Sequence, residues 1–149
     1  MSKTNPLIQL HFISKCSISS RGKLKAFISS IFKKEGKLLE SLSIIFCNDS
    51  YLFELNREFL SHDFYTDILS FRLSSSGKPM VAEIYISVDR VRDNARNLNS
   101  TFKSEIHRVI FHGILHFCGY KDKSPSDIIK MRSAEDKLLK RYKISFTTT

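Results

Sequence analysis

The stretch from His112 to Asp122 constrains this chain more than any other part of the sequence. It begins inside the segment from Ser100 to Phe117, whose pattern is typical of an amphipathic helix. His112 and His116 are four residues apart, so a helix places them one turn apart on the same face. Two imidazoles at this spacing can bind one zinc ion.

A turn after this helix supplies a possible third ligand. Gly119 is the expected end of the helix, because glycine adopts the left-handed conformation at no steric cost. The chain can then turn back and bring Asp122 toward the histidines. Two nitrogens and one carboxylate oxygen leave a fourth position for water, which is typical of a catalytic zinc site. Two histidines at this spacing also occur by chance in helices that bind no metal. Gly119 and Asp122 are the residues that favour a metal site here.

The residue after the first histidine argues against one class of enzyme. In the His-Glu-x-x-His pattern of zinc proteases, a glutamate at that position is the general base. This chain has Gly113 there. The sequence therefore predicts a zincin-like metal-binding helix without the base of a protease, and peptide hydrolysis is disfavoured.

Three blocks of sequence point to a known family. In chain order they are Leu55-Asn56-Arg57-Glu58-Phe59 with Thr66-Asp67-Ile68-Leu69-Ser70-Phe71, then Glu83-Ile84-Tyr85-Ile86-Ser87, then His112-Gly113-x-Leu115-His116-x-x-Gly119-Tyr120. Together they resemble the YbeY family, the bacterial endoribonucleases that mature ribosomal RNA. The likeness spans about residues 42 to 136, and the histidine block is its most specific part.

The chain departs from that family's pattern at three positions. Asp122 stands where the family has a histidine, although aspartate is also a zinc ligand. Leu60 stands where the family has an arginine that contacts the RNA or assists catalysis. Ala82-Glu83 replaces Gly-Asp, which keeps the acid but lengthens it. The resemblance thus implies a retained metal site with altered affinity and leaves the detailed mechanism open.

The resemblance implies a zinc-dependent endoribonuclease specific for single-stranded RNA. His112, His116 and Asp122 would hold one zinc ion and form the catalytic centre. The substrate would be ribosomal RNA of the small ribosomal subunit, at the 3′ end of 16S rRNA, with a further role in ribosome quality control.

The resemblance also implies a substrate groove beside the metal. The loop and strand that include Thr66 and Asp67 would line this groove. Arg72 would supply some of the positive charge that is missing at Leu60.

The reaction step itself stays open at the level of sequence. Zinc would lower the pKa of its water and polarise a phosphoryl oxygen. Because position 113 is glycine, no general base is assigned, and either a metal-bound hydroxide or the RNA 2′-hydroxyl could attack. Two other functions also remain: a zinc hydrolase acting on peptides or another small substrate, and a non-catalytic, ribosome-associated RNA-binding factor.

Composition fits a basic protein of one domain, residues 1–149. The chain is 42% hydrophobic, within the globular range, and carries a net charge of +9. Such a charge favours a polyanion such as nucleic acid as partner, although lysines also serve only to solvate a surface. Three cysteines without paired spacing are expected to be reduced thiols of a cytoplasmic protein. We expect neither a secretory signal nor a membrane span.

The remaining pattern predicts an α+β fold, with a small mixed β-sheet and helices packed around it. The expected strands are Leu7–Ile13, Leu42–Cys47, Ile68–Leu73 and Val81–Ser87. The expected helices run from Ser19 or Ser20 to Glu35, from Asn48 or Asp49 to Phe59, from Val88 to Leu98, from Ser100 to Phe117 and from Ser124 to about Tyr142. Residues 60–65 are expected to form a loop.

Overall fold

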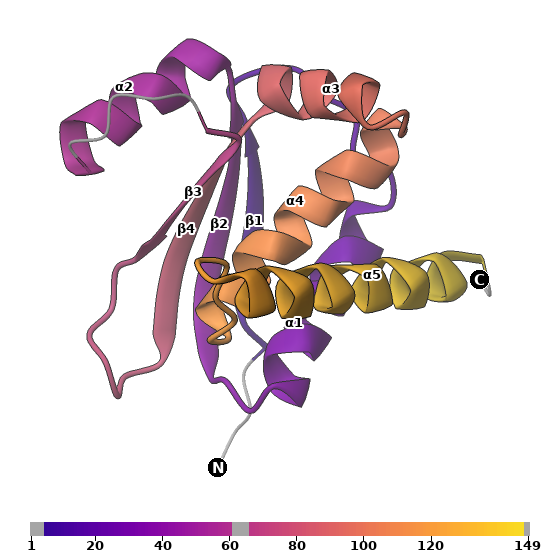
Figure 1. The fold of residues 1–149 in the computed structure, drawn as a ribbon. Coiled ribbons are helices and arrows are strands. Elements are labelled where there is room, and N and C mark those ends of the chain that lie inside the picture. Colours follow the sequence, from indigo (N-terminus) through magenta and orange to yellow (C-terminus); the bar gives the residue numbers. More distant parts are fainter. Residues whose placement is uncertain (1–4, 61–65, 148–149) are drawn as a thin grey trace.

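The computed structural model describes residues 5–60 and 66–147, which form four strands and five helices (Figure 1). In chain order these are β1 (Leu7–Phe12), α1 (Arg21–Lys34), β2 (Leu39–Cys47), α2 (Asp49–Leu60), β3 (Ile68–Arg72), β4 (Met80–Ser87), α3 (Val88–Asn97), α4 (Phe102–Phe117) and α5 (Pro125–Thr147).

The strands form one mixed sheet in the order β1-β2-β4-β3. β1 pairs with β2 and β2 with β4 in parallel, whereas β3 runs antiparallel to β4. Helix α1 makes the crossover between the parallel strands β1 and β2, as parallel pairing requires. The α+β class and the small mixed sheet predicted from the sequence are confirmed.

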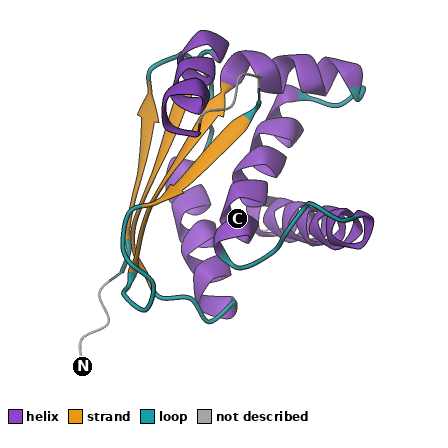
Figure 2. Ribbon diagram, turned by 60° about the vertical axis from the view of Figure 1, so that its left-hand side comes forward, coloured by secondary structure: helices purple, strands orange, loops and turns teal. Residues whose placement is uncertain are grey.

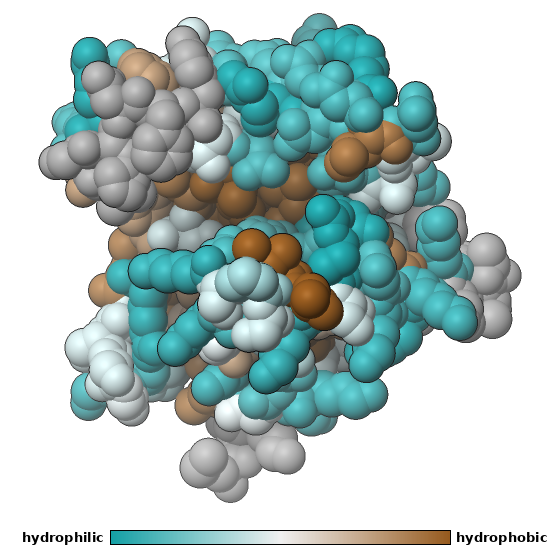
Figure 3. Space-filling view, viewed as in Figure 1, coloured by the Kyte–Doolittle hydropathy of each residue, from teal (hydrophilic) through white to brown (hydrophobic). Residues whose placement is uncertain are grey.

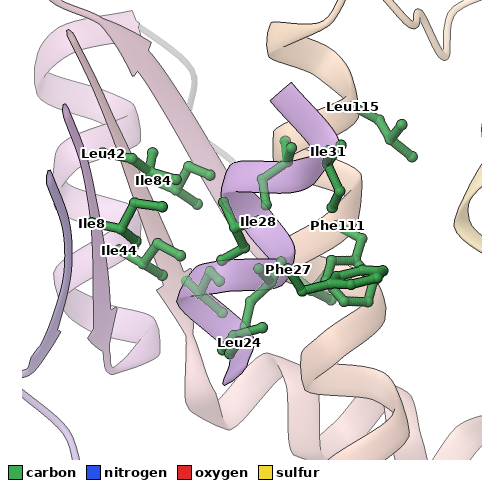
Figure 4. Packing of buried hydrophobic residues seen from close by; sticks show 14 of the residues in the cluster. Ile8, Leu24, Phe27, Ile28, Ile31, Leu42, Ile44, Ile84, Phe111 and Leu115 are labelled. Carbon is green, nitrogen blue, oxygen red and sulfur yellow. The ribbon is translucent and has the colours of Figure 1, made fainter. Parts of the chain in front are cut away.

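The main core lies between one face of the sheet and the helices α1 and α4. Figure 2 shows most of the helical mass on one side of the sheet. In Figure 4, Ile28 of α1 lies near Ile44 and Ile84 of the sheet, and Phe27 of the same helix lies near Phe111 of α4. Helix α4 is therefore held between α1, the sheet and α5, and its register fixes where its histidines lie.

The alternation predicted for β4 is present. Ala82, Ile84 and Ile86 are buried on the side of the main core. Tyr85 lies on the opposite face, where it packs against a smaller cluster that includes Leu69. The period of two along β4 thus separates two apolar clusters, as expected for a strand.

Side-chain caps begin the two helices that carry the site. The Thr101 hydroxyl accepts a hydrogen bond from the Ser104 N–H at 3.0 Å, and the Ser124 hydroxyl accepts one from the Asp127 N–H at 3.1 Å. Serine and threonine are residues that commonly cap helices in this way. Ser20 precedes α1 as expected, but it has φ 54° and no side-chain capping bond.

Helix α5 differs from its prediction in two ways. It continues to Thr147 instead of ending near Tyr142, because neither glycine nor proline follows to stop it. Ile128 and Ile129, which the sequence places in its apolar set, are 50% and 69% exposed. Of the predicted loop at 60–65, Leu60 is the last residue of α2, and residues 61–65 lie outside the described part of the chain.

Within the described residues, no helix combines the length and the apolar character that crossing a membrane requires.

Candidate metal centre

The turn after α4 brings the third predicted ligand back to the helix. Gly119 has φ +101°, the left-handed conformation expected at the end of this helix. The Tyr120 N–H donates to the Leu115 carbonyl at 3.0 Å, and the Gly119 N–H donates to the His116 carbonyl at 3.0 Å. These bonds fix the turn and direct the following residues, Asp122 included, toward the exposed side of α4.

The three predicted ligand atoms converge on one point. Nε2 of His112 lies 3.0 Å from Nε2 of His116, and Oδ2 of Asp122 lies 3.2 Å from the His116 nitrogen and 3.4 Å from the His112 nitrogen. A tetrahedral zinc ion with bonds of about 2.0–2.1 Å requires ligand atoms about 3.3 Å apart. The donor set and its spacing therefore fit a zinc-sized ion.

The opposite edge of each imidazole is held by an acceptor. Nδ1 of His116 lies 3.0 Å from the Tyr120 carbonyl, and Nδ1 of His112 lies 2.6 Å from Oε2 of Glu135. A carbonyl oxygen can only accept, so Nδ1 of His116 carries the proton and its Nε2 offers a lone pair. Second partners of this kind orient metal-binding histidines and raise their basicity.

Sequence reasoning missed Glu135 and its partner Arg108. Glu135 is 5% exposed, and the Arg108 guanidinium donates to it at 2.8 Å and to Asp136 at 2.6 Å. A signal was present, because Glu135 follows the buried Met131 by one helical turn. An acid on the buried stripe of a helix needs a partner, and that requirement could have identified it.

The electrostatics of this cluster favour an ion pair between Glu135 and His112. Burial of the His112 ring disfavours its charged form, but the hydrogen bond and charge of Glu135 outweigh burial and raise the pKa of the imidazole. Burial likewise disfavours the charged form of Glu135, yet His112 and Arg108 lower the pKa of its carboxyl. The carboxylate therefore remains charged and available to hold the ring.

A pocket of about 440 Å³ opens beside these ligands. Its walls come from the residue before β3, from α3, α4 and α5, and from the turn that carries Asp122; they include Asp67, Asn94, Leu98, Glu105, Arg108, His112, Ile128 and Glu135. Figure 3 shows a hollow between α3 and α5, with hydrophobic surface at its base and mostly hydrophilic surface along its edges. The pocket therefore offers space and charged side chains directly beside the candidate metal ligands.

Two further carboxyl groups line this pocket. Burial raises the pKa of Asp67, and the positive charge of His112 opposes that rise. Burial also raises the pKa of Glu105, opposed by Arg108. The Asn94 amide donates to Asp67 at 3.4 Å. Carboxyls with raised pKa values can exchange protons nearer to neutral pH, which gives the pocket acid–base groups besides the histidines.

The predicted substrate-binding residues lie at different places. Asp67 lines the pocket, and the neighbouring Thr66 is half-buried, with its hydroxyl donating to the Ile68 carbonyl at 3.4 Å. The guanidinium of Arg72 donates to the carbonyls of Ser75 and Lys78, in the turn after β3. Arg72 is thus bound to that turn and is not among the described residues that line the pocket.

Comparison with known proteins identifies relatives over most of the chain. The family model described as endoribonuclease YbeY matches residues 13–143. An endoribonuclease YbeY from Cytophaga hutchinsonii is 44% identical over 80% of this chain and 83% of its own. One from Flavobacterium johnsoniae is 38% identical over 93% of this chain and 99% of its own. A solution structure of a Thermotoga maritima protein is 28% identical and superposes with a TM-score of 0.63, covering 95% of this chain and 93% of that one.

Proposed function

Since this chain belongs to the YbeY endoribonuclease family, a family of hydrolases that act on RNA in ribosomal RNA processing, we propose that it is a zinc-dependent enzyme specific for single-stranded RNA. We propose the precursor 3′ end of 16S rRNA, within the small ribosomal subunit, as its substrate, with a part in ribosome quality control. Such a substrate would place its work in the cytoplasm.

One observation carries the metal-dependent part of this proposal. The ligand atoms of His112, His116 and Asp122 form a triangle with sides of 3.0–3.4 Å beside a pocket of about 440 Å³. Two imidazole nitrogens and one carboxylate oxygen are ligands that zinc accepts, and three protein ligands are typical of a catalytic site. Asp122, which the resemblance aligns with a histidine of the family, brings its Oδ2 within 3.4 Å of both imidazole nitrogens.

The side chains around this point have separable roles. When bound, the ion supplies Lewis acidity, which lowers the pKa of water and polarises a phosphoryl oxygen. Glu135 holds the His112 ring so that Nε2 faces the ion, and the Tyr120 carbonyl does the same for His116. Asp67 lies in the same pocket as a candidate proton acceptor or substrate contact.

The substrate contacts are proposed on chemistry and position. A net charge of +9 favours a polyanionic substrate, and neutralising phosphates is the main source of affinity for RNA. Thr66 and Asp67 directly precede β3, and Asp67 lines the pocket beside the metal ligands, so we propose that they contact the RNA strand near its cleaved bond. Arg72 would contact RNA only outside this pocket, after releasing its two turn carbonyls.

The test compares cleavage of a labelled single-stranded RNA by the zinc-loaded protein, by His116→Ala and by His11→Ala. His11 is an exposed histidine of β1, so its variant controls for loss of a histidine away from the site. We expect His116→Ala to lose its bound zinc and to slow cleavage by at least about 100-fold, with His11→Ala unchanged. Equal cleavage by all three proteins would refute the proposal.

The same assay separates the two possible nucleophiles. Attack by the RNA 2′-hydroxyl leaves a 2′,3′-cyclic phosphate and requires that hydroxyl at the cleaved bond. Attack by water does not, so an RNA with a single 2′-deoxy nucleotide at that bond would still be cut. Mass spectrometry of the product ends distinguishes these outcomes.

A further inference from the structure

A second pocket, of about 300 Å³, lies between the beginning of α4 and the second half of α5. Its walls include Thr101, Lys103, Ser104, His107, Leu139, Tyr142 and Lys143. The metal-site pocket shares none of these residues: its walls on α4 include Glu105 and His112, and its walls on α5 come from the first half of that helix. Arg108, which bridges the two helices through Glu135 and Asp136, lines the metal-site pocket and is not among the described residues that line the second one.

His107 brings an unsatisfied acceptor to this second pocket. The side chain is 4% exposed, and its Nδ1 lies 2.6 Å from the Lys103 carbonyl. A carbonyl can only accept, so Nδ1 carries the proton and Nε2 is an acceptor. Nε2 is buried and has no hydrogen-bond partner among the described residues. A buried nitrogen of this kind requires a donor, and the pocket that it lines is where a ligand could bring one.

The rest of the pocket favours an anion. The pocket opens at the N-terminus of α4, a helix of sixteen residues. There the Thr101 hydroxyl accepts a hydrogen bond from the Ser104 N–H. The N–H groups of the first turn have no carbonyl within the helix, and the helix dipole favours negative charge at this end. Lys103 and Lys143 add positive charge, and no acidic residue is among the described residues that line the pocket.

The pocket also offers an apolar surface for a flat ring. Tyr142 packs against His107, with ring centroids 5.1 Å apart, and Leu139 lies one helical turn before Lys143 on the same helix. A ligand that fits must therefore combine an anionic group, a hydrogen-bond donor and a ring. A nucleotide has all three, in its phosphate, its ribose or base donors, and its base.

We propose that this second pocket binds one nucleotide of the RNA strand, with its phosphate at the N-terminus of α4 between Lys103 and Lys143, and with a hydroxyl or amino group donating to Nε2 of His107. This assignment rests on the proposed function for the identity of the ligand as RNA. His107 precedes His112 by five residues, about 7.5 Å along the helix axis. The pocket is therefore a subsite for a nucleotide outside the bond that is cut.

The direct test is titration of the full chain with adenosine monophosphate, monitored by NMR through the side-chain ¹⁵N resonances of its histidines. We expect Nε2 of His107 to shift on binding, with neither inorganic phosphate nor adenosine alone producing the full shift. Unchanged His107 resonances with all three probes would overturn the proposal. This outcome does not involve cleavage, so it is independent of whether the metal centre is catalytic.

Charge reversal tests the phosphate contact without altering buried residues. Lys103 and Lys143 are exposed, so Lys103→Glu with Lys143→Glu should fold normally. Lys33→Glu, at the exposed end of α1, is the matched control. We expect the double variant to bind adenosine monophosphate and a long single-stranded RNA more weakly, by about tenfold or more. The Lys33→Glu variant should bind both ligands as the wild-type protein does. Equal binding by pair and control would refute the assignment.

Kinetics separate this subsite from the catalytic centre. The lysine pair should raise KM for a long RNA and leave kcat unchanged, whereas a dinucleotide that reaches only the metal ligands should be cut with unchanged KM. His107→Phe keeps a ring in the core and removes the acceptor, and we expect the same pattern for long RNA. An equal rise in KM for the long RNA and for the dinucleotide, or a fall in kcat alone, would contradict a separate subsite.

Discussion

The carboxylate of Glu135 lies 2.6 Å from Nδ1 of His112, on the edge of the ring opposite the nitrogen that faces His116 and Asp122. Glu135 comes from α5 and His112 from α4, so the packing of two helices sets the orientation of a candidate metal ligand. Arg108 holds the same carboxylate from its other oxygen. The candidate metal centre is therefore coupled to the α4–α5 interface.

Glu135→Gln tests this coupling. The amide is neutral, so the variant loses the charge that supports His112, and we expect zinc affinity to fall by about 10- to 100-fold. Asp136→Asn is the control, because Asp136 contacts Arg108 but is exposed and does not contact His112. Competition with a chromophoric chelator measures both affinities. If Glu135→Gln bound zinc as tightly as Asp136→Asn, the carboxylate would have no role in holding the ring.

Arg108→Met tests the other partner of Glu135. The methionine fills similar space but leaves a buried carboxylate with His112 as its remaining close partner, and we expect a loss of about 1–3 kcal/mol in the free energy of unfolding. Arg132→Met is the matched control, since Arg132 lies 4.0 Å from the same carboxylate and its side chain is 57% exposed. The control should lose less than about 1 kcal/mol. Urea denaturation at neutral pH compares them, and equal losses would contradict a special role for Arg108.

The sequence was sufficient to predict which side chains of the candidate site come together where these are close in the chain. His112, His116 and Asp122 fall within eleven residues, and helical spacing with one glycine turn determines how they meet. The resemblance to the family extended this to the strand that begins after Asp67. Local rules suffice for such a cluster because few conformations connect its members.

The parts that were missed depend on contacts between distant segments. Glu135 reaches His112 across 23 residues of sequence, and the pocket at the N-terminus of α4 combines residues from two helices. Ile128 and Ile129 follow an apolar pattern, yet α5 leaves both exposed, with Ile128 on the wall of the metal-site pocket. Which side of α5 is buried depends on how it crosses α4, and periodicity alone does not determine that.

Gly113 shows a second reason why sequence interpretation was incomplete. The sequence pattern indicates only that a protease base is missing at this position, whereas the structure gives the glycine a packing role. A Cβ atom there would lie 2.8 Å from Cδ1 of Ile68 and 3.1 Å from Cδ1 of Ile84. Position 113 therefore faces the sheet, and a longer side chain would be directed into aliphatic groups of β3 and β4.

Gly113→Leu should consequently destabilise the fold. Overpacking against β3 and β4 is expected to cost about 1–3 kcal/mol, more than the gain in helix propensity. Gly22→Leu is the control, because Gly22 is also helical but exposed, and a Cβ atom added there would meet nothing within 4 Å. The control should be neutral or stabilised by up to about 1 kcal/mol. Chemical denaturation measures both, and a Gly113→Leu protein as stable as the control would show that α4 can move away from the sheet.

The buried His107 predicts how stability depends on pH. Burial lowers the pKa of its imidazole below the usual 6.5, and the nearby Lys103 charge acts in the same direction. Below about pH 6.5 the unfolded chain therefore takes up a proton at this residue that the folded chain does not. The contribution of His107 to stability is complete above the unfolded pKa. It is lost as the pH falls from there through the folded pKa, at no more than about 1.4 kcal/mol per pH unit.

His107→Phe isolates this contribution, because phenylalanine occupies the same place beside Tyr142 without titrating. Between about pH 7 and about pH 5, the wild-type protein should lose more free energy of unfolding than the variant does. Urea denaturation at several pH values in this interval, with both proteins free of metal, gives the difference directly and cancels the titration of the other groups. Parallel stability curves would mean that His107 becomes protonated in the folded protein as easily as in the unfolded chain.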